Sequence, residues 1–287
     1  MQKEKINITI PVFNRSDLIK RAVENALKIE KVDSVTIVND GSNEETHRAI
    51  LDFAGFEKIN YIRLHKNAGA DTARNISILL SDFDWVSFHD SDDLYDRQKI
   101  KKQIAHARRY SADAAFCQFV FFDMEGNLSV RGSKIRLLQD LFTNVVFENN
   151  FENYILINPG LFSKKVFETL GGYKMGRIGG DDDMQYRLVL SGRKICFVNE
   201  PLILKFDSED SLTIQKDTNL QSEKRLNFYK YLHENIERLK ENPEKAAVPI
   251  DLPEDLEIEI IYGDIDPQKR KEIPITEAAE RVLSKIS

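Results

Sequence analysis

The chain has 287 residues, of which 41% are hydrophobic, and a formal net charge of -6. This length and composition allow a large buried core, in one substantial domain or one domain plus an appendage. Residues 241–287 hold 12 acidic and 6 basic side chains and the first 240 hold 35 of each sign, so no basic excess favours nucleic acid as a partner.

Strand-like and helix-like segments alternate over the first 112 residues. Four β-rich apolar runs are predicted to be strands, and each is followed by a polar loop and a helix. The predicted strands are Ile6–Val12, Ser34–Val38, Asn60–Leu64 and Asp84–Phe88; the helices are Asp17–Ile29 with Ser16 as N-cap, a stretch ending at Phe53, Thr72–Leu80 and Arg97–Arg109. Alternation at this spacing predicts a mostly parallel sheet covered by helices, which places all four polar loops at the ligand-binding edge.

The second half of the chain mixes strands and helices. Residues 114–122 are predicted to be a buried strand with a hairpin turn at 125–127, and residues 134–157 show no clear element. The remaining predicted elements are the helices Lys164–Leu170, Asp181–Ser191 and Asn219–Leu239, a Gly171-Gly172 turn, and a strand at 195–204. Beyond residue 241 we expect an acidic extension outside the chemistry, with an edge strand at Leu256–Tyr262 and a short helix at Thr276–Ile286.

Other features of the sequence concern location. Cys117 and Cys196 have no CxxC or Cys/His neighbours, so we expect buried, reduced thiols rather than zinc ligands. The longest charge-free run, Asn153–Ser163, has 11 residues and is too short to span a bilayer. The N-terminus lacks the apolar region of a signal peptide. We therefore expect a cytoplasmic protein with no transmembrane segment, and docking at the inner face of the cell membrane stays open.

Three carboxylates follow the fourth predicted strand within four positions: Asp90, Asp92 and Asp93. They repel one another unless a cation compensates them. Mg²⁺ or Mn²⁺ suits such a loop, because these ions take one or two carboxylates and complete their shell with phosphate and water. The alternative is that Asp92 or Asp93 caps a helix beginning at Leu94. Four polar loops on one sheet edge favour a ligand site.

These residues resemble a known family, the family 2 glycosyltransferases, which are inverting enzymes of the GT-A fold. The matching segments, in order, are Ile8–Arg15, Val38–Ser42, Asn67–Gly69 with Ala73–Asn75, Asp90–Asp93, Leu161–Phe167, Leu170–Tyr173 and Asp181–Gly192. The likeness covers roughly residues 5–215. It implies an α/β, Rossmann-like GT-A domain with a nucleotide-sugar-binding half (1–112), an acceptor-binding and catalytic half (113–240), and a small α+β C-terminal extension (241–287).

The resemblance also implies a nucleotide site and a metal site. The residues implied for the nucleoside, usually uridine, and its phosphates are Pro11, Phe13 where many relatives have Tyr, Asn14, Arg15, Asp40 as acceptor from the base imide, Asn67, Gly69, Arg74, and Asp90 at the ribose. Asp92 would bind Mn²⁺ or Mg²⁺ on the diphosphate, with Asp93 behind it. Lys205 is a candidate phosphate contact, where relatives often carry Arg or His.

An inverting transfer needs a general base for the acceptor hydroxyl, and the resemblance places an acidic residue six positions before an Arg. Asp181 is six before Arg187 and is the first candidate. The family usually has Glu then Asp there, whereas this chain has Gly180 before its aspartates, so Asp182 is the second candidate. Alternatively, the aspartates serve only to complement the helix dipole.

The resemblance implies transfer from a UDP-sugar to a glycan or lipid-linked acceptor, in synthesis of a bacterial capsule, lipopolysaccharide or wall polymer. The extension is a candidate surface for oligomer formation. A non-catalytic sugar-nucleotide-binding relative is the main alternative, because only the region of the base separates it from an enzyme. A metal-dependent phosphohydrolase is less favoured, since its nucleophilic Asp should follow the first strand. A nicotinamide oxidoreductase would need a GxGxxG motif there, and the chain has none.

Overall fold

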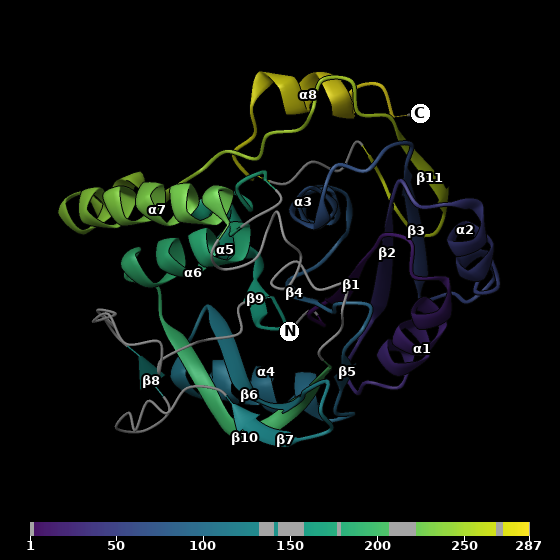
Figure 1. The fold of residues 1–287 in the computed structure, drawn as a ribbon, viewed down its shortest axis with the longest axis horizontal. Coiled ribbons are helices and arrows are strands. Elements are labelled where there is room, and N and C mark those ends of the chain that lie inside the picture. Colours follow the sequence, from purple (N-terminus) through teal and green to yellow (C-terminus); the bar gives the residue numbers. More distant parts are fainter. Residues whose placement is uncertain are drawn as a thin grey trace.

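The computed structural model describes residues 3–131, 141–142, 158–176, 179–206, 222–267 and 272–286. An 11-stranded mixed sheet forms the middle layer of this part, and helices cover both faces (Figure 1). The strands are β1 (Ile6–Val12), β2 (Ser34–Asp40), β3 (Ile59–Leu64), β4 (Trp85–Phe88), β5 (Leu94–Tyr95), β6 (Ala114–Phe122), β7 (Leu128–Arg131), β8 (Leu141–Phe142), β9 (Leu161–Ser163), β10 (Ile195–Phe206) and β11 (Ile258–Tyr262). The helices are α1 (Ser16–Leu27), α2 (Glu44–Leu51), α3 (Ala70–Leu80), α4 (Lys99–Tyr110), α5 (Lys164–Leu170), α6 (Gly180–Leu190), α7 (Glu223–Glu241) and α8 (Glu277–Leu283).

The first four strands form the parallel block that the sequence predicts. β1 pairs in parallel with both β2 and β4, and β2 pairs in parallel with β3. The carboxyl ends of these strands therefore lie at one edge of the sheet, and the four polar loops gather there.

The other half of the sheet mixes strand directions. β9 runs antiparallel to both β4 and β6, and β10 runs parallel to β6. Register shifts interrupt the β6–β10 pairing between Val198 and Leu204, beside the point where β5 pairs with β10. The end of β10 is thereby brought to the loop that follows β4.

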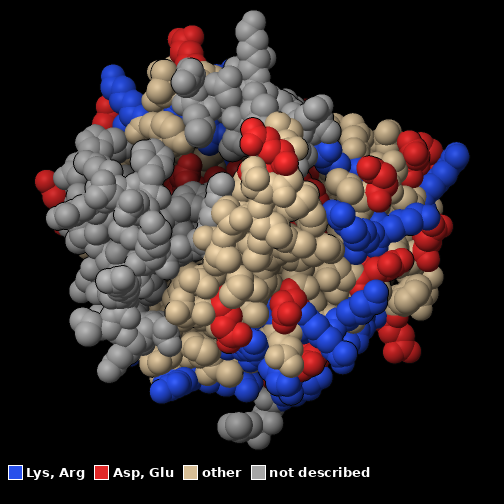
Figure 2. Space-filling view, turned by 60° about the horizontal axis from the view of Figure 1, so that its bottom comes forward, with Lys and Arg blue, Asp and Glu red and all other residues tan. Residues whose placement is uncertain are grey.

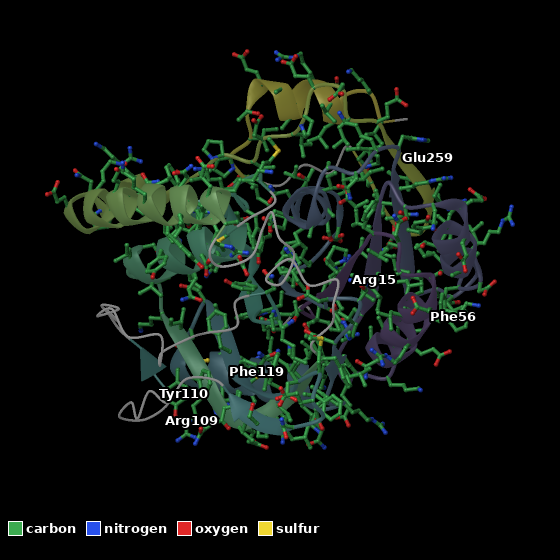
Figure 3. The ribbon with its side chains drawn as sticks, viewed as in Figure 1. Arg15, Phe56, Arg109, Tyr110, Phe119 and Glu259 are labelled. Atoms are coloured by element: carbon green, nitrogen blue, oxygen red, sulfur yellow. The ribbon has the colours of Figure 1, made fainter. Side chains whose placement is uncertain are left out.

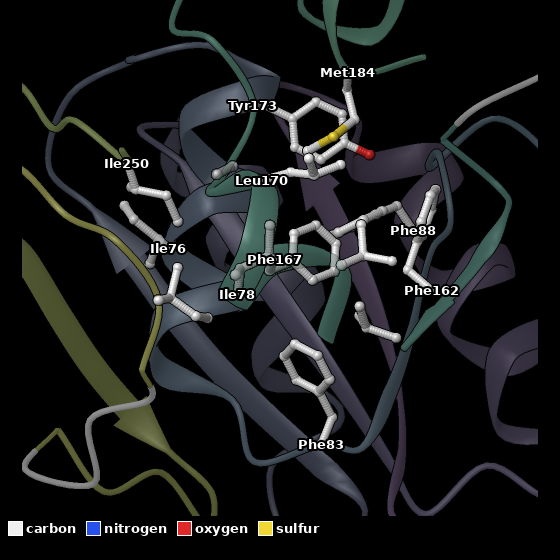
Figure 4. Packing of buried hydrophobic residues seen from close by; sticks show 14 of the residues in the cluster. Ile76, Ile78, Phe83, Phe88, Phe162, Phe167, Leu170, Tyr173, Met184 and Ile250 are labelled. Carbon is white, nitrogen blue, oxygen red and sulfur yellow. The ribbon is translucent and has the colours of Figure 1, made fainter. Parts of the chain in front are cut away.

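Two hydrophobic cores lie on opposite faces of the sheet. Apolar residues of α1, α2 and α4 pack on one face, and those of α3, α5 and α6 pack on the other. Figure 4 shows the second core, in which Phe88, Phe162 and Phe167 meet beneath Tyr173 and Met184. A sheet buried on both faces explains why the first strands read as almost continuous apolar runs.

A polar network also fixes α3 against the sheet. The Ser77 hydroxyl of α3 lies 2.6 Å from that of Thr9 in β1, and the Ser81 hydroxyl donates to Thr36 in β2 at 3.0 Å. Asn7 accepts from Thr36 at 3.0 Å and donates to Thr9 at 3.1 Å. Because buried hydroxyl groups need partners, this network sets both the position and the rotation of α3.

The C-terminal segment belongs to the same body. β11 pairs antiparallel with β3 and forms an outer strand of the sheet, as predicted, where Glu259 is labelled in Figure 3. Ile250, Leu252, Leu256 and the buried residues of α8 join the core around α3 and α5. The segment therefore shares a core with the main domain, because it is too short to bury its apolar side chains alone.

The structure corrects some predicted boundaries. Ser16 is the first residue of α1, and Arg15 holds the cap position without a side-chain cap bond, so the prediction of Ser16 as N-cap is wrong. Asn14 has a left-handed backbone conformation, with φ 51°, in the loop before α1. The helix begins at Ser16, one residue before the predicted start at Asp17. The uninterpreted stretch 134–157 lies outside the described residues except for β8, which pairs with β10.

Candidate active site

The loop after β1 forms one side of the predicted nucleotide pocket. Pro11 is buried in β1, whereas the Phe13 side chain is 45% exposed, so its ring is open to a stacking base. The Asn14 side-chain oxygen accepts from the backbone N–H of Asn43 at 2.8 Å, which joins this loop to the loop after β2. Arg15 lies at the start of α1, near the middle of the view in Figure 3.

Asp40, at the end of β2, organises the loop after β3. Its carboxylate accepts from the backbone N–H groups of Ala68 at 2.7 Å and Gly69 at 2.9 Å, and from the Asn67 side chain at 2.9 Å. Gly41 permits this approach, because a Cβ there would lie 2.3 Å from the backbone of the same loop. The structure thus brings Asp40, Asn67 and Gly69 together, and the bond from Asp40 to a base stays a prediction.

Arg74, on α3, connects two carboxylates. One terminal guanidinium nitrogen donates to Asp71 at 2.9 Å and the other donates to Asp90 at 2.8 Å, while the group lies 5.6 Å from the centre of the Tyr173 ring. Burial alone would raise the pKa of Asp90, but Arg74 and then Lys205 hold it below its usual value. Asp90 is therefore ionised and held in place by Arg74.

Asp71 is a site residue that the sequence did not reveal. The predicted helix begins at Thr72, which leaves Asp71 in the preceding loop, but α3 begins at Ala70. With the correct start, the spacing of three between Asp71 and Arg74 indicates an ion pair on one helix face. Burial raises the pKa of Asp71 to about 7; Arg74 opposes the rise and Asp181 adds to it.

The acidic loop at residues 90–93 does not begin a helix. Leu94–Tyr95 forms β5, which pairs antiparallel with β10, and α4 begins only at Lys99. The alternative in which Asp92 or Asp93 caps a helix at Leu94 is therefore wrong, because the pairing with β10 keeps the backbone extended. The three carboxylates are held in a short loop between two strands.

Asp92 and Asp93 lie in different surroundings. Asp93 is fully buried; one of its carboxylate oxygens has no hydrogen-bond partner in the described part of the chain, and the other lies 3.4 Å from the Lys205 ammonium. Asp92 is half-buried and forms no ion pair among the described residues. Burial raises the pKa of Asp92, and it raises that of Asp93 to about 7 against the opposing charge of Lys205. Asp90 adds to the rise in both.

A divalent cation fits this set of donors. No group of three or more His, Cys, Asp or Glu side chains that could hold a metal occurs in the described part of the chain. Mg²⁺ and Mn²⁺ nevertheless bind through one or two carboxylates where phosphate and water complete the shell. The raised pKa of Asp92 and the unpartnered oxygen of Asp93 mark carboxylates that a cation would compensate.

Lys205 lies near the end of β10, which is two residues longer than the predicted strand. Its ammonium lies 3.4 Å from Asp93 and 4.0 Å from Asp90. Burial lowers the pKa of Lys205, but these carboxylates outweigh burial and raise it above its usual value. In this arrangement Lys205 balances the acidic loop, and its contact with phosphate stays a prediction.

The head of α6 presents three aspartates in different ways. Asp183 is buried and accepts from the Arg187 side chain at 2.7 Å. The other two guanidinium nitrogens of Arg187 donate to carbonyl oxygens of the turn at 170–172, at 2.9 Å and 2.6 Å. Asp183 is thus committed to Arg187, whereas Asp181 and Asp182 are only half-buried. These two are the aspartates that the sequence proposes as bases.

Asp182 has the environment of a basic carboxylate. Burial raises its pKa to about 7, Asp181 adds to the rise, and Arg225 of α7 opposes it. A carboxylate that titrates near neutral pH suits proton abstraction better than an ordinary surface aspartate does. The spacing to Arg187 favours Asp181 and the raised pKa favours Asp182, so both stay candidates.

The hairpin of β6 and β7 lies on the side of the sheet opposite β11. Four of its large apolar side chains are exposed: Phe122, Met124, Leu128 and Val130. Figure 2 turns the lower side of the molecule forward and shows many uncharged side chains at its centre, with Lys and Arg along one flank. No helix within the described ranges is long and apolar enough to cross a membrane.

Comparison with known proteins identifies the family. Residues 7–171 match the sequence profile of a family described as Glycosyl transferase family 2. This range is more than half of the chain and contains the residues predicted for the nucleotide and the metal, apart from the candidate phosphate contact Lys205. The chain belongs to glycosyl transferase family 2.

Several bacterial proteins are similar to the chain. Glycosyltransferase GlyA of Streptococcus pneumoniae is 25% identical over 210 residues, which cover 69% of this chain and 30% of GlyA. Glycosyltransferase GlyG of the same organism is 22% identical, with 70% of each chain covered. Chondroitin synthase of Escherichia coli is 26% identical over 82% of this chain and 35% of its own. The chain thus spans about a third of the length of GlyA and of chondroitin synthase.

Solved structures share the fold. TarS of S. aureus, in complex with UDP-GlcNAc, has a TM-score of 0.60 at 16% identity, covering 72% of this chain and 60% of its own. The mannosyltransferase PcManGT of Pyrobaculum calidifontis, in complex with GDP-Man and Mn²⁺, has a TM-score of 0.54 at 13% identity, covering 86% and 74%. At such low identity these likenesses concern the fold, which is the α/β GT-A arrangement.

Proposed function

We propose that this family 2 glycosyltransferase is an inverting, metal-dependent enzyme. It moves a sugar from a nucleoside diphosphate sugar, with UDP as the first choice of nucleotide, to a hydroxyl of a glycan or lipid-linked acceptor. The role we propose for it is synthesis of a bacterial surface polysaccharide. The observation that carries the proposal is the arrangement of the acidic loop at 90–93 and the acidic head of α6, which are joined through Arg74 and Asp71.

In this proposal the first half of the chain binds the donor. Phe13 stacks on the base, Asp40 holds the loop of Asn67 and Gly69 against it, and Asp90 faces the ribose while Arg74 fixes its carboxylate. Asp92 holds the cation, with Asp93 behind it. The bound cation supplies Lewis-acid stabilisation of the departing diphosphate.

The second half supplies the base. Asp181 or Asp182 removes the proton from the acceptor hydroxyl as the oxygen attacks the anomeric carbon. Attack opposite the leaving diphosphate inverts the anomeric configuration. Arg187 and Asp183 anchor α6, so the two candidate bases on the same helix keep a fixed direction. The exposed β6–β7 hairpin is an accessible apolar surface that would suit the lipid part of an acceptor or a membrane face.

Bound nucleotides in the structural neighbours support the choice of donor class. TarS is solved with UDP-GlcNAc and PcManGT with GDP-Man and Mn²⁺. The main alternative, a non-catalytic sugar-nucleotide-binding relative, would share the donor site but would not turn over.

The decisive experiment measures nucleotide release from a panel that includes UDP-GlcNAc and GDP-mannose, with and without Mn²⁺. We expect Mn²⁺-dependent release from one donor. We also expect Asp92→Ala to weaken Mn²⁺-dependent donor binding by at least tenfold, since one carboxylate ligand is lost. The control is Asp52→Ala, which removes an exposed carboxylate at the end of α2.

Three results would count against the proposal. Donor binding without release over a broad set of acceptors would favour the non-catalytic relative. Full Mn²⁺-dependent affinity in Asp92→Ala would remove Asp92 as the metal ligand. A product that retains the anomeric configuration, measured by NMR, would contradict the inverting mechanism.

A further inference from the structure

The carboxylate of Asp71 occupies the space beside the first residue of α6. A Cβ built on Gly180 would lie 2.1 Å from one Asp71 carboxylate oxygen and 2.6 Å from its carboxyl carbon. The other carboxylate oxygen accepts from Arg74 at 2.9 Å. Asp71 is 7% exposed, so this contact is sealed from solvent. Any side chain at position 180 would displace it.

Glycine at 180 is required by this contact and not by the backbone. Gly179 has φ 75°, a conformation that favours glycine, whereas the φ of Gly180 lies outside the left-handed region. After Asp71, the nearest atom of the described residues to a Cβ at 180 is the Lys174 carbonyl oxygen at 3.0 Å, which a small movement would relieve. The Asp71 carboxylate is therefore the main obstacle to a side chain there.

The contact extends a chain of charged groups from the acidic loop at residues 90–93 to α6. Asp90 accepts from Arg74, Arg74 donates to Asp71, and Asp71 lies against Gly180, next to the candidate base Asp181. Where the family that the sequence resembles usually has Glu then Asp, this chain has Gly180 before its aspartates. In this chain a carboxylate occupies that space, but α3 supplies it.

We infer that Asp71 is a positioning residue, which stands in space for a side chain at position 180 and couples Arg74 in the donor site to the head of α6. This inference rests on the proposed function. Its physical basis is preorganisation, because a base that is displaced by about 1 Å loses on the order of a hundredfold in rate. Asp71 contacts no reacting atom and acts through Arg74 and Gly180.

An exchange of carboxylates between the two helices tests the inference. We expect Asp71→Ala to lower kcat at least tenfold with little change in donor KM, because Asp90 still holds Arg74. Gly180→Glu alone should also lower kcat and melt at a lower temperature, because its side chain meets the Asp71 carboxylate. The double variant Asp71→Ala/Gly180→Glu should regain most of the kcat and melt above Gly180→Glu, since α6 then supplies the carboxylate.

The possible outcomes separate the inference from the proposed function. A double variant no more active than the worse single variant, or Asp71→Ala with wild-type kcat, overturns the positioning role. Absence of turnover in the wild type overturns the proposed function instead. In that case the melting temperatures still test whether the two side chains compete for the same space. If they do, the double variant must melt at a higher temperature than Gly180→Glu alone. Asp52→Ala is again the control, with kcat and melting temperature expected to match the wild type.

Discussion

Asp181, Asp182 and Asp183 are consecutive in sequence but differ in what they contact. Asp183 points into the protein and binds Arg187, which in turn holds the turn at 170–172. Asp182 is half-buried and lies near Arg225 of α7, and Asp181 lies near Asp71. A helix turns by about 100° per residue, so three neighbouring side chains must point in three directions. Asp181 and Asp182 therefore remain the two candidate bases.

Substitution of each aspartate by asparagine separates these roles. For the true base, the change should lower kcat by about 10² to 10⁴ and leave donor affinity unchanged, because proton abstraction is lost and binding is not. We expect this of Asp181→Asn; if Asp182→Asn shows it, the register is shifted by one. The measurements are kcat and the donor dissociation constant. Wild-type kcat in both variants would exclude both residues as the base.

Asp183→Asn is the matched control for that series. Arg187 is only 2% exposed, so loss of its counter-charge should lower the free energy of unfolding by roughly 3 kcal/mol. Chemical unfolding measures this loss. If Asp183→Asn kept full stability but lost turnover, the assignment of Asp183 to Arg187 alone would be wrong.

At the scale of elements, the turn between α5 and α6 is where the C-terminal segment meets the part of the chain that carries the candidate bases. The backbone N–H of Val248 donates to the carbonyl of Leu170 at 2.8 Å, and a Cβ on Gly171 would lie 1.8 Å from the Val248 carbonyl oxygen. Ile250 is fully buried, and Figure 4 shows it beside Ile76 of α3. The same turn accepts from Arg187, so the segment supports the part of the chain that holds α6.

Ile250→Ala tests whether this segment is part of the main core. We expect the free energy of unfolding to fall by about 2 to 5 kcal/mol, through lost burial and the cavity left behind. The control is Leu226→Ala on α7, where the side chain is 56% exposed and a change within about 0.5 kcal/mol is expected. A loss of less than 1 kcal/mol in Ile250→Ala, or a separate unfolding transition for the segment, would contradict a shared core.

At the scale of the whole molecule, the core around α1, α2 and α4 contains a buried cation. The Lys99 ammonium donates to the Ser87 hydroxyl and to the Gln103 side chain, both at 3.0 Å, and lies 4.2 Å from the centre of the Tyr95 ring. No carboxylate among the described residues forms an ion pair with it. Burial lowers the pKa of Lys99 to about 8, and Cys117 opposes this effect.

This shift predicts how stability depends on pH. The usual lysine pKa is 10.5, so between pH 8 and 10.5 the unfolded chain binds more protons than the folded one at this position. Stability due to Lys99 therefore rises with pH across this window, by about 3 kcal/mol in total. Unfolding of the wild type and of Lys99→Met should be compared at pH 7.5, 9 and 10.5. The difference in the free energy of unfolding between the two proteins should change by about 3 kcal/mol over this range. The same pH dependence in both proteins would contradict the lowered pKa of Lys99.

The sequence predicted much of the fold of the first 112 residues because its signals there are local. The bounds of β1 are as predicted, and the other strands differ by a few residues, since burial on both faces makes their apolar runs easy to recognise. β5 has only two residues and exists because β10 pairs with it, so no local pattern could reveal it. For the same reason, the capping alternative at Leu94 could be decided only by the structure.

The sequence by itself determined the strand-end loops, the acidic loop at 90–93 and the acidic head of α6, because each is a short run of residues whose chemistry does not depend on distant partners. Tertiary structure decided which of these groups meet. Asp71 and Gly180 are more than a hundred positions apart, and Lys205 reaches Asp93 from the far end of β10. The physical reason is that burial and charge neutralisation depend on spatial neighbours. The three aspartates of α6 are therefore alike in sequence, and only the fold pairs Asp183 with Arg187.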